Sequence, residues 1–238
     1  MSIKTEILKL KEELPSNVKL VAVSKFHPLD AIKEAYEAGQ RVYGESRPQE
    51  LYSKVTELQS SPDYSKGTYA DIEWHFIGHL QTNKLKFVLP YVSMVESVDS
   101  LRLLEAIDSW SAAAGKVTDV LLEYHIAEED TKQGFDAGQI KEILVSGRYY
   151  QNVRIRGLMG MATFTDDEDI IRADFSRLVN LKAELDKYKT SIPAQANLTL
   201  DFDTLSFGMT HDYKIAVEMG ADIVRIGTMI FGERDYSR

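Results

Sequence analysis

The chain alternates between short apolar runs and longer segments in which apolar residues recur every three or four positions. The first 14 residues predict an amphipathic helix with one apolar face, formed by Ile3, Ile7, Leu10 and Leu14. Eight strand-like apolar runs follow, at 19–24, 40–44, 73–78, 92–97, 119–126, 153–160, 199–208 and 222–227. Helical patterns lie between them, at Leu29–Ala38, Pro48–Leu58, Leu101–Ala113, Ala137–Val145, Asp169–Lys187 and His211–Met219, with a shorter candidate at 80–88.

This order predicts an α/β fold built from about eight strand-then-helix units. Eight is the number of units that closes a parallel barrel, and 238 residues lie near the usual length of that fold, roughly 250 residues. Several runs are apolar throughout, as expected for strands that helices cover from outside. We therefore predict a single (β/α)8 barrel of the TIM type over residues 1–238, with an extra N-terminal helix. A doubly wound open sheet is the alternative, because periodicity alone cannot close a barrel.

Composition narrows the function classes. The chain carries 28 Lys and Arg against 37 Asp and Glu, a net charge of −9, which disfavours a nucleic-acid surface but not a local anion pocket. Cysteine is absent, which excludes disulfides, thiolate metal sites and cysteine nucleophiles and is typical of the cytoplasm. Charged residues interrupt the apolar ones at the N-terminus, so we expect no signal peptide, no membrane span and a cytoplasmic protein.

Lys25 is the first candidate for chemistry, because it follows an apolar run at the predicted carboxyl end of a strand. Active sites of parallel barrels lie at that end. The amine of a free lysine is protonated at neutral pH, whereas in a desolvated barrel mouth its pKa falls and the neutral amine can attack an aldehyde. Taken alone, however, Lys25 is better explained as a lysine that extends past a strand end to reach solvent.

The segment "LSFGMTHD" at 205–212 has the composition of a phosphate-binding turn. Ser206 is predicted to end a strand, Gly208 follows closely, and Thr210 is placed to cap a helix that starts near His211. Small residues, a hydroxyl and the free amides of a helix N-terminus can cradle a phosphate. An ordinary strand-to-helix turn with a capping threonine explains this stretch equally well.

The segment "VRIGTMIFGER" at 224–234 adds a second turn of this kind. Arg225 ends the last predicted strand, Gly227 permits close backbone approach to a ligand, and Thr228 supplies a hydroxyl. Phosphate sites of barrels often use the loops after the seventh and eighth strands. The two segments occupy those places, and their convergence favours a phosphate site.

Other motifs point to no further chemistry. His75 and His79 are four residues apart, but no Glu follows His75 as the zinc-protease helix requires, so we expect no metal site. The chain also lacks a Walker loop, a Gly-x-Gly-x-x-Gly turn and a Gly-x-Ser-x-Gly elbow.

Taken together, the segments resemble the pyridoxal phosphate homeostasis proteins, which are single-domain relatives of the barrel domain of alanine racemase. The most specific are "WHFIGHLQTNK" (74–84) and "VRIGTMIFGER". The others are "VAVSK" (21–25), "YGESRPQE" (43–50), "SVDS" (97–100), "EEDTKQGF" (128–135), "RGLMGMA" (156–162) and "LSFGMTHD". They span nearly the whole chain in the order of the family.

The resemblance implies that Lys25 carries pyridoxal 5′-phosphate (PLP) as an internal imine, a Schiff base. It also implies that Arg225 faces the pyridine nitrogen. A guanidinium does not accept a proton, so that nitrogen tends to stay unprotonated and the cofactor is a weaker electron sink. The residues implied to hold the phosphate are Ser206, Thr210, Gly227 and Thr228.

Two positions depart from the family pattern. Ser46 and His125 stand where the family usually has asparagine. Both positions are expected near the ring face or the substrate side of the cofactor, so the contacts there do not carry over.

The resemblance further implies a role in intracellular PLP homeostasis, by buffering or delivering the cofactor to apo-forms of PLP enzymes. The alternative is a PLP-dependent amino-acid racemase, which needs an acid/base group on each face of the imine. Lys25 would serve one face; in alanine racemases a tyrosine from a second domain serves the other. The chain ends at Arg238, soon after the eighth strand, so we expect that domain to be absent, and we predict a monomer without substantial catalysis of its own. A barrel enzyme acting on a phosphorylated metabolite without a cofactor would leave Lys25 idle.

Overall fold

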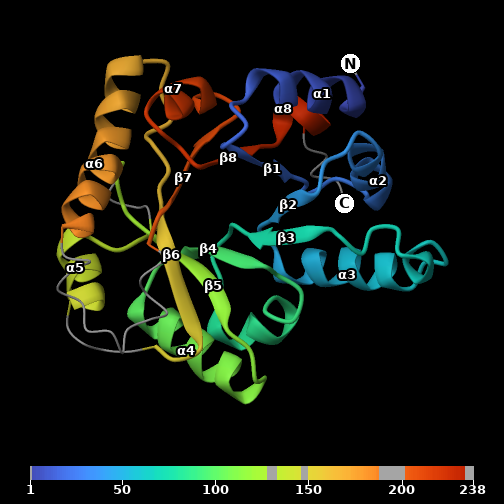
Figure 1. The fold of residues 1–238 in the computed structure, drawn as a ribbon, viewed down its shortest axis with the longest axis horizontal. Coiled ribbons are helices and arrows are strands. Elements are labelled where there is room, and N and C mark those ends of the chain that lie inside the picture. Colours follow the sequence, from blue (N-terminus) through green and yellow to red (C-terminus); the bar gives the residue numbers. More distant parts are fainter. Residues whose placement is uncertain (1, 128–132, 146–149, 188–201, 234–238) are drawn as a thin grey trace.

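The computed structural model describes residues 2–127, 133–145, 150–187 and 202–233. Within them, eight parallel strands form a closed barrel in the order of the chain, from β1 to β8 (Figure 1). The barrel closes where β1 pairs with β8, with Val21 opposite Arg225. The strands are β1 Lys19–Val23, β2 Val42–Glu45, β3 Glu73–Phe76, β4 Met94–Val98, β5 Thr118–Glu123, β6 Val153–Met159, β7 Thr204–Met209 and β8 Ile223–Ile226. The predicted (β/α)8 architecture is confirmed, and the open sheet is excluded.

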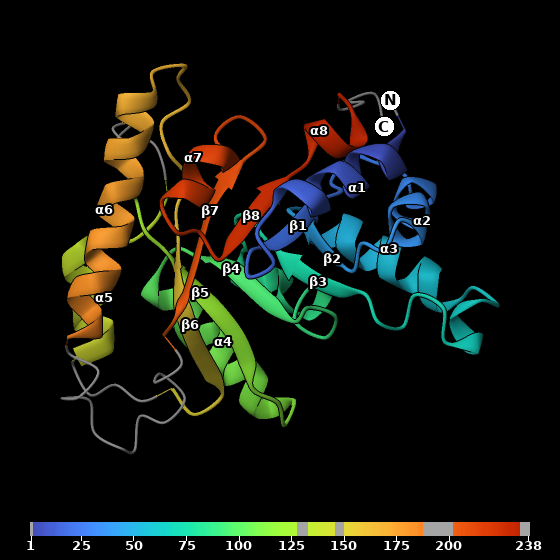
Figure 2. The same cartoon turned by 45° about the horizontal axis from the view of Figure 1, so that its top comes forward.

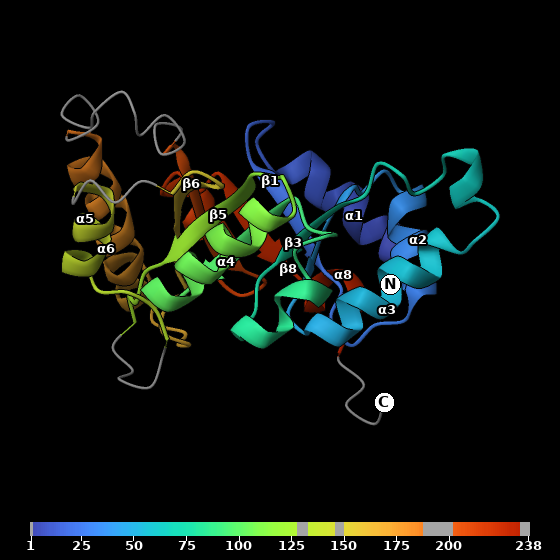
Figure 3. The ribbon, with the colours of Figure 1, turned by 90° about the horizontal axis from the view of Figure 1, so that it is seen from below.

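Helices cover the outside of the barrel. They are α1 Ile3–Glu13, α2 Leu29–Glu37, α3 Pro48–Gln59, α4 Leu101–Ala113, α5 Ala137–Val145, α6 Glu168–Asp186, α7 Tyr213–Glu218 and α8 Thr228–Phe231, with 3-10 turns η1 Tyr64–Lys66 and η2 Thr82–Phe87. The predicted N-terminal helix is α1; it begins after Ser2, whose side chain accepts from the amide of Thr5 at 3.2 Å, and it packs against α2 and α8 (Figure 2). On the other side of the barrel, α5 lies beside α6 (Figure 3).

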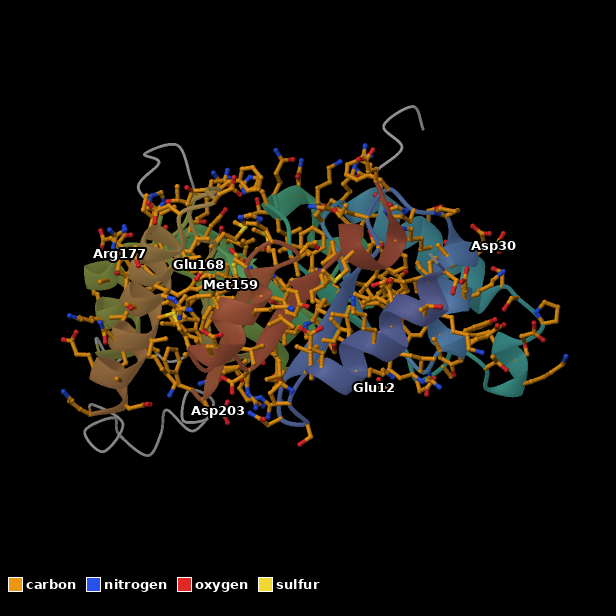
Figure 4. The ribbon with its side chains drawn as sticks, turned by 90° about the horizontal axis from the view of Figure 1, so that it is seen from above. Glu12, Asp30, Met159, Glu168, Arg177 and Asp203 are labelled. Carbon is orange, nitrogen blue, oxygen red and sulfur yellow. The ribbon has the colours of Figure 1, made fainter. Side chains whose placement is uncertain are left out.

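Two hydrophobic cores hold these layers. The larger lies between strands and helices, where for example the rings of Phe175 on α6 and Phe207 on β7 are 4.7 Å apart. The smaller fills the inside of the barrel and consists of Val21, Met94, Leu121, Met159 and Ile223. Figure 4 places Met159, the last residue of β6, inside the molecule, and Asp203, just before β7, at its lower edge. The inner core therefore supports the polar residues that lie farther along each strand.

The segment boundaries differ from the prediction at a few places. The candidate at 80–88 forms the 3-10 turn η2 instead of an α-helix. The strand predicted at 119–126 ends at Glu123, after which Tyr124 bridges to Phe135. Of the predicted strand 199–208 and the segment 128–135, residues 199–201 and 128–132 lie outside the described residues. No helix among the described residues is both long enough and apolar enough to cross a membrane.

Candidate functional site

Lys25 lies in a tight turn at the carboxyl end of β1. The amide of His27 donates to the carbonyl of Ser24 at 3.1 Å, so Lys25 and Phe26 are the central residues of a β-turn. Phe26 has φ +66°, in the left-handed region that favours glycine and costs other residues about 1–2 kcal/mol. A strained turn of this kind persists only where its surroundings hold it in place.

A charged cluster of two buried residues, Glu45 and Lys54, and the partly buried Glu50 holds this turn from outside the barrel. We call Glu45, Glu50 and Lys54 the brace. The Glu50 carboxylate accepts from the amide of Phe26 at 2.6 Å, and that of Glu45 accepts from the hydroxyl of Ser24, also at 2.6 Å. Both residues that flank Lys25 are thereby fixed by a glutamate.

Lys54, on α3, forms an ion pair with both glutamates. Its Nζ lies 2.7 Å from Oε1 of Glu45, 2.7 Å from Oε1 of Glu50 and 2.8 Å from the carbonyl oxygen of Ser24. Three acceptors match the three donors of an ammonium group. Burial nevertheless raises the pKa of Glu45 to about 7, assisted by the charge of Glu50 and opposed by Lys54 and Ser24.

Arg225 is held by a second buried cluster, inside the barrel. Its Nη1 donates to the hydroxyl of Ser206 at 2.6 Å, and its Nη2 donates to the carbonyl of Gly160 at 3.0 Å. Ser206 in turn donates to Oε2 of Glu96 at 2.5 Å, and Oε1 of Glu96 lies 2.5 Å from Nδ1 of His75. We call Arg225, Ser206, Glu96 and His75 the inner network.

The inner network keeps its carboxyl ionised. Burial alone would raise the pKa of Glu96, but the hydrogen bond and charge of His75, the charge of Arg225 and the bond from Ser206 outweigh it, so the pKa lies below its usual value. An ionised Glu96 accepts, so Nδ1 of His75 carries the proton in this bond. Burial lowers the pKa of Arg225, against the opposing charges of Glu96, Asp212 and Glu123.

The predicted phosphate residues lie on β7 and just beyond the ends of β7 and β8, and they do not all share one role. The hydroxyl of Thr210 accepts from the amide of Gly227 at 3.3 Å, which joins the turn after β7 to the turn after β8. Thr228 begins α8 next to this contact. Ser206 is fully buried, and its hydroxyl is engaged by Arg225 and Glu96. Its assignment to the phosphate stays a prediction.

Two local predictions in this region are wrong. Thr210 does not cap a helix: the helix begins only at Tyr213, and the hydroxyl of Thr210 accepts from the amide of Gly227. β7 does not end at Ser206 but continues to Met209.

The histidines of "WHFIGH" also separate. His75 is buried against Glu96, whereas Nδ1 of His79 lies 2.8 Å from Oδ2 of Asp99. Among the residues that the structure describes, no group of three or more His, Asp or Glu is arranged to hold a metal ion.

The two positions that depart from the family pattern lie in loops at the barrel mouth. The backbone of Ser46 packs so closely on Gly78, after β3, that a Cβ added at Gly78 would lie 2.4 Å from the carbonyl oxygen of Ser46. The amide of His125 donates to the carbonyl of Phe135 at 3.0 Å, just beyond the end of β5.

Several residues of the site were missed by the sequence reasoning. Glu50 and Lys54 have the i,i+4 spacing of a helical ion pair, which is common on solvated helix faces and did not indicate burial. Glu123 directly follows the three apolar residues at 120–122 and ends β5, and this signal was available but not used. The partners of Glu96 are His75, Ser206 and Arg225. They come from three strands far apart in the sequence, so no local pattern predicts these contacts.

Comparison with known proteins identifies the family. The family model described as alanine racemase, N-terminal domain, matches residues 2–235. A pyridoxal phosphate homeostasis protein from Aquifex aeolicus is 37% identical over 92% of this chain and 88% of its own length. The chain belongs to the pyridoxal phosphate homeostasis protein family. The family member from Escherichia coli strain K12 is 33% identical over 94% of this chain and 89% of its own.

Solved structures agree with this assignment. PipY of Synechococcus elongatus PCC7942, solved with PLP bound, has a TM-score of 0.82 and 34% identity, covering 97% of this chain and all of that one. An alanine racemase from Clostridium difficile shares the fold, with a TM-score of 0.73 at 11% identity, covering 98% of this chain and 56% of that one. The resemblance seen in the sequence motifs is thus confirmed at the level of family and fold.

Proposed function

We propose that this pyridoxal phosphate homeostasis protein binds PLP at the carboxyl end of the barrel, with Lys25 forming the imine, and that it buffers or delivers the cofactor without substantial catalysis. The observation that carries the proposal is the turn of Lys25: a strained turn held by the buried Glu45 and Lys54 and the partly buried Glu50, beside the strand that bears Arg225. The brace fixes the residues on both sides of Lys25, so the position from which its side chain starts is set relative to Arg225.

The surroundings of Lys25 fit the chemical groups of PLP. The loop contact between Thr210 and Gly227, with Thr228 beside it, offers hydroxyl and amide groups suited to a phosphate. Arg225 uses two of its five donors on Ser206 and Gly160, so others can meet a ring nitrogen. When bound, PLP supplies an aldehyde carbon and an electron-accepting ring.

The carrier role is favoured by the names of the relatives, which are homeostasis proteins. A racemase would in addition need an acid/base group on each face of the imine. A protein that only holds and releases the cofactor needs an anchoring lysine and a phosphate site. It does not need the cofactor ring to be a strong electron sink.

Spectroscopy of the purified protein tests the imine. We expect PLP to give the protein a yellow imine absorption that borohydride reduction fixes onto a peptide containing Lys25. Lys25→Ala should lose both, whereas Lys33→Ala, on α2 close to the turn, should keep both. An unchanged spectrum in Lys25→Ala would refute the assignment.

Activity assays test the carrier role. Holo-protein incubated with a panel of L-amino acids should produce no D-isomer at enzymatic rates. Transfer of PLP to an apo-enzyme should outpace spontaneous release of PLP into buffer. Sustained racemisation would favour the alternative, a PLP-dependent racemase.

A further inference from the structure

Glu123 points into the mouth of the barrel from β5. Its neighbour two residues earlier, Leu121, belongs to the inner core, and residues two apart in a strand face the same side. The pairing with β6 agrees, because Glu123 lies opposite Met159, which is also part of the inner core. Glu123 is therefore the inward residue one layer above the apolar floor.

The position of Glu123 relates it to the candidate cofactor site. In an eight-stranded closed barrel, β5 lies across from β1, so Glu123 approaches the mouth from the side opposite Lys25. Arg225 projects from the same layer of β8, two residues beyond the inner-core residue Ile223, and each of the two side chains feels the charge of the other. Glu123 thus faces the space that Lys25 and Arg225 border.

Glu123 is buried without a hydrogen-bonding partner for its carboxyl group. Only 6% of the residue is exposed. Among the described residues, no donor is hydrogen-bonded to its side chain, although Glu45, Glu50 and Glu96 all have such donors. A carboxyl group that is nine-tenths buried and lacks donors can still accept a hydrogen bond from a ligand or take up a proton.

The surroundings of Glu123 bring the pKa of its carboxyl group close to neutral pH. Its pKa is raised to about 7, chiefly by burial and also by the carboxylate of Asp99, while the charges of Arg225 and His79 oppose the rise. The charged groups that face it thus come from β8 and from the loops after β3 and β4. His125 follows two residues later, and Glu96 on the adjacent β4 is engaged by His75 and Ser206.

We propose that Glu123 is a proton-exchanging residue of the cofactor site, which takes up a proton from solvent when PLP binds. This inference rests on the proposed function. The step is a simple protonation: the carboxylate of Glu123 becomes a carboxylic acid, the proton comes from bulk water, and no bond of the cofactor changes. A phosphate dianion and an anionic ring oxygen entering the mouth add negative charge beside Glu123 and exclude water, and both effects favour its protonated form.

The proposal predicts how the affinity for PLP changes with pH. Ligand binding that favours the protonated carboxyl weakens as pH rises through the pKa of the unliganded protein, near 7, and levels off above the pKa of the complex. Replacement by glutamine keeps the shape and removes the titration. Between pH 7 and 8, wild-type protein should therefore take up more protons per bound PLP than Glu123→Gln, by roughly half a proton or more.

Calorimetry of PLP binding measures this difference. Titrations of wild type and Glu123→Gln are run at pH 7.5 in two buffers of different ionisation enthalpy, neither containing a primary amine or phosphate, which would compete for the site. The visible spectrum of each sample confirms that PLP is bound. Glu12→Gln, an exposed glutamate on α1 (Figure 4), should behave as wild type.

Two further measurements keep the proposal testable if Glu123→Gln fails to fold: a second variant, and a measurement on the apoprotein. Asp99→Asn removes a charge that disfavours ionisation of Glu123, so the pH midpoint of proton uptake should move downward. In the apoprotein at pH 6, the infrared band of protonated carboxyl groups should be weaker in Glu123→Gln, leaving a contribution from Glu45.

The outcomes separate the two proposals. Equal proton uptake by wild type and Glu123→Gln, with PLP bound to both, would overturn the role of Glu123 and leave PLP binding intact. An unshifted midpoint in Asp99→Asn would also count against it. Absence of any PLP spectrum in wild type would overturn the proposed function instead, while the infrared band still reports on Glu123.

Discussion

Glu45 and Glu96 are both fully buried glutamates near the carboxyl ends of strands, yet their pKa values move in opposite directions. The pKa of Glu45 rises to about 7, whereas that of Glu96 falls below its usual value. Burial is the same for both, so it does not decide whether the group is ionised. The difference lies in how their partners are arranged.

In the inner network, both oxygens of Glu96 accept a hydrogen bond, and the cation beside it is an arginine that keeps its proton. In the brace, Ser24 and Lys54 converge on Oε1 of Glu45, and its Oε2 is buried without a partner. Lys54 is also shared with Glu50. The inner network therefore holds a permanent charge, and the brace holds one that can be titrated away.

The largest expected effect separates the two glutamates directly. Glu96→Gln should lower the free energy of unfolding by about 3–5 kcal/mol, because it leaves the buried charge of Arg225 uncompensated. Glu45→Gln should cost about 1 kcal/mol or less at pH 7, because Glu45 is near its pKa there and Lys54 keeps Glu50. Urea unfolding of both variants measures the difference. Equal losses would mean that the partner arrangement is not what distinguishes them.

Lys54→Met should destabilise the protein by an amount that depends on pH. At pH 8 the two glutamates of the brace lose their shared cation while ionisation is favoured, and we expect a loss of about 2–3 kcal/mol. At pH 6, below the pKa of Glu45, protonation of that carboxyl relieves part of the loss. Unfolding curves at the two pH values test this. Glu218→Ala, which breaks the surface pair with Arg172, should behave as wild type at both.

Glu123→Gln should stabilise the apoprotein at pH 8, by on the order of 1–2 kcal/mol, and leave it unchanged at pH 5. The folded-state pKa of Glu123, about 7, lies above the ordinary value of 4.5. The folded state therefore binds more protons than the unfolded state between these values, and wild-type stability falls as pH rises through this window. Thermal unfolding from pH 5 to 8 should show a flatter profile for the variant.

The smallest expected effect on stability concerns the turn that contains Lys25 and Phe26. Phe26→Gly should relieve the positive φ, and the greater flexibility of glycine when unfolded should offset most of that gain, leaving stability within about 1 kcal/mol of wild type. A turn that no longer needs support should tolerate loss of the brace better. The double variant with Lys54→Met should therefore show a coupling of about 0.5–1 kcal/mol in a double-mutant cycle. Strict additivity would indicate that the brace does not act through Phe26.

The barrel was predictable because its signal is local and repeated. Each strand is an apolar run and each helix has its own periodicity, as for α4, whose predicted bounds Leu101–Ala113 are those observed. Lys25 and Arg225 could be singled out as candidates for the same reason, since a charge at the end of an apolar run is conspicuous in sequence. The predicted capping by Thr210 failed because its hydroxyl accepts instead from the amide of Gly227, a contact between two turns that are far apart in the sequence.

The two charged clusters were not predictable from local patterns. The inner network joins residues of β3, β4, β7 and β8, and the bond from Ser206 to Glu96 spans 110 residues. Which oxygen of Glu45 accepts, and whether the other is left without a donor, depends on packing to a fraction of an ångström. Ionisation at this site is therefore a property of the folded barrel and not of any motif.

Lys54 also bears on which amine can react. Its ammonium donates to Ser24, Glu45 and Glu50, so its protons are committed and its nitrogen has no lone pair to offer. If Lys25 forms the imine proposed above, Lys54 is therefore not a competing nucleophile for the same aldehyde. The contacts that hold the turn of Lys25 thus also favour chemoselectivity, because they occupy the neighbouring amine of Lys54.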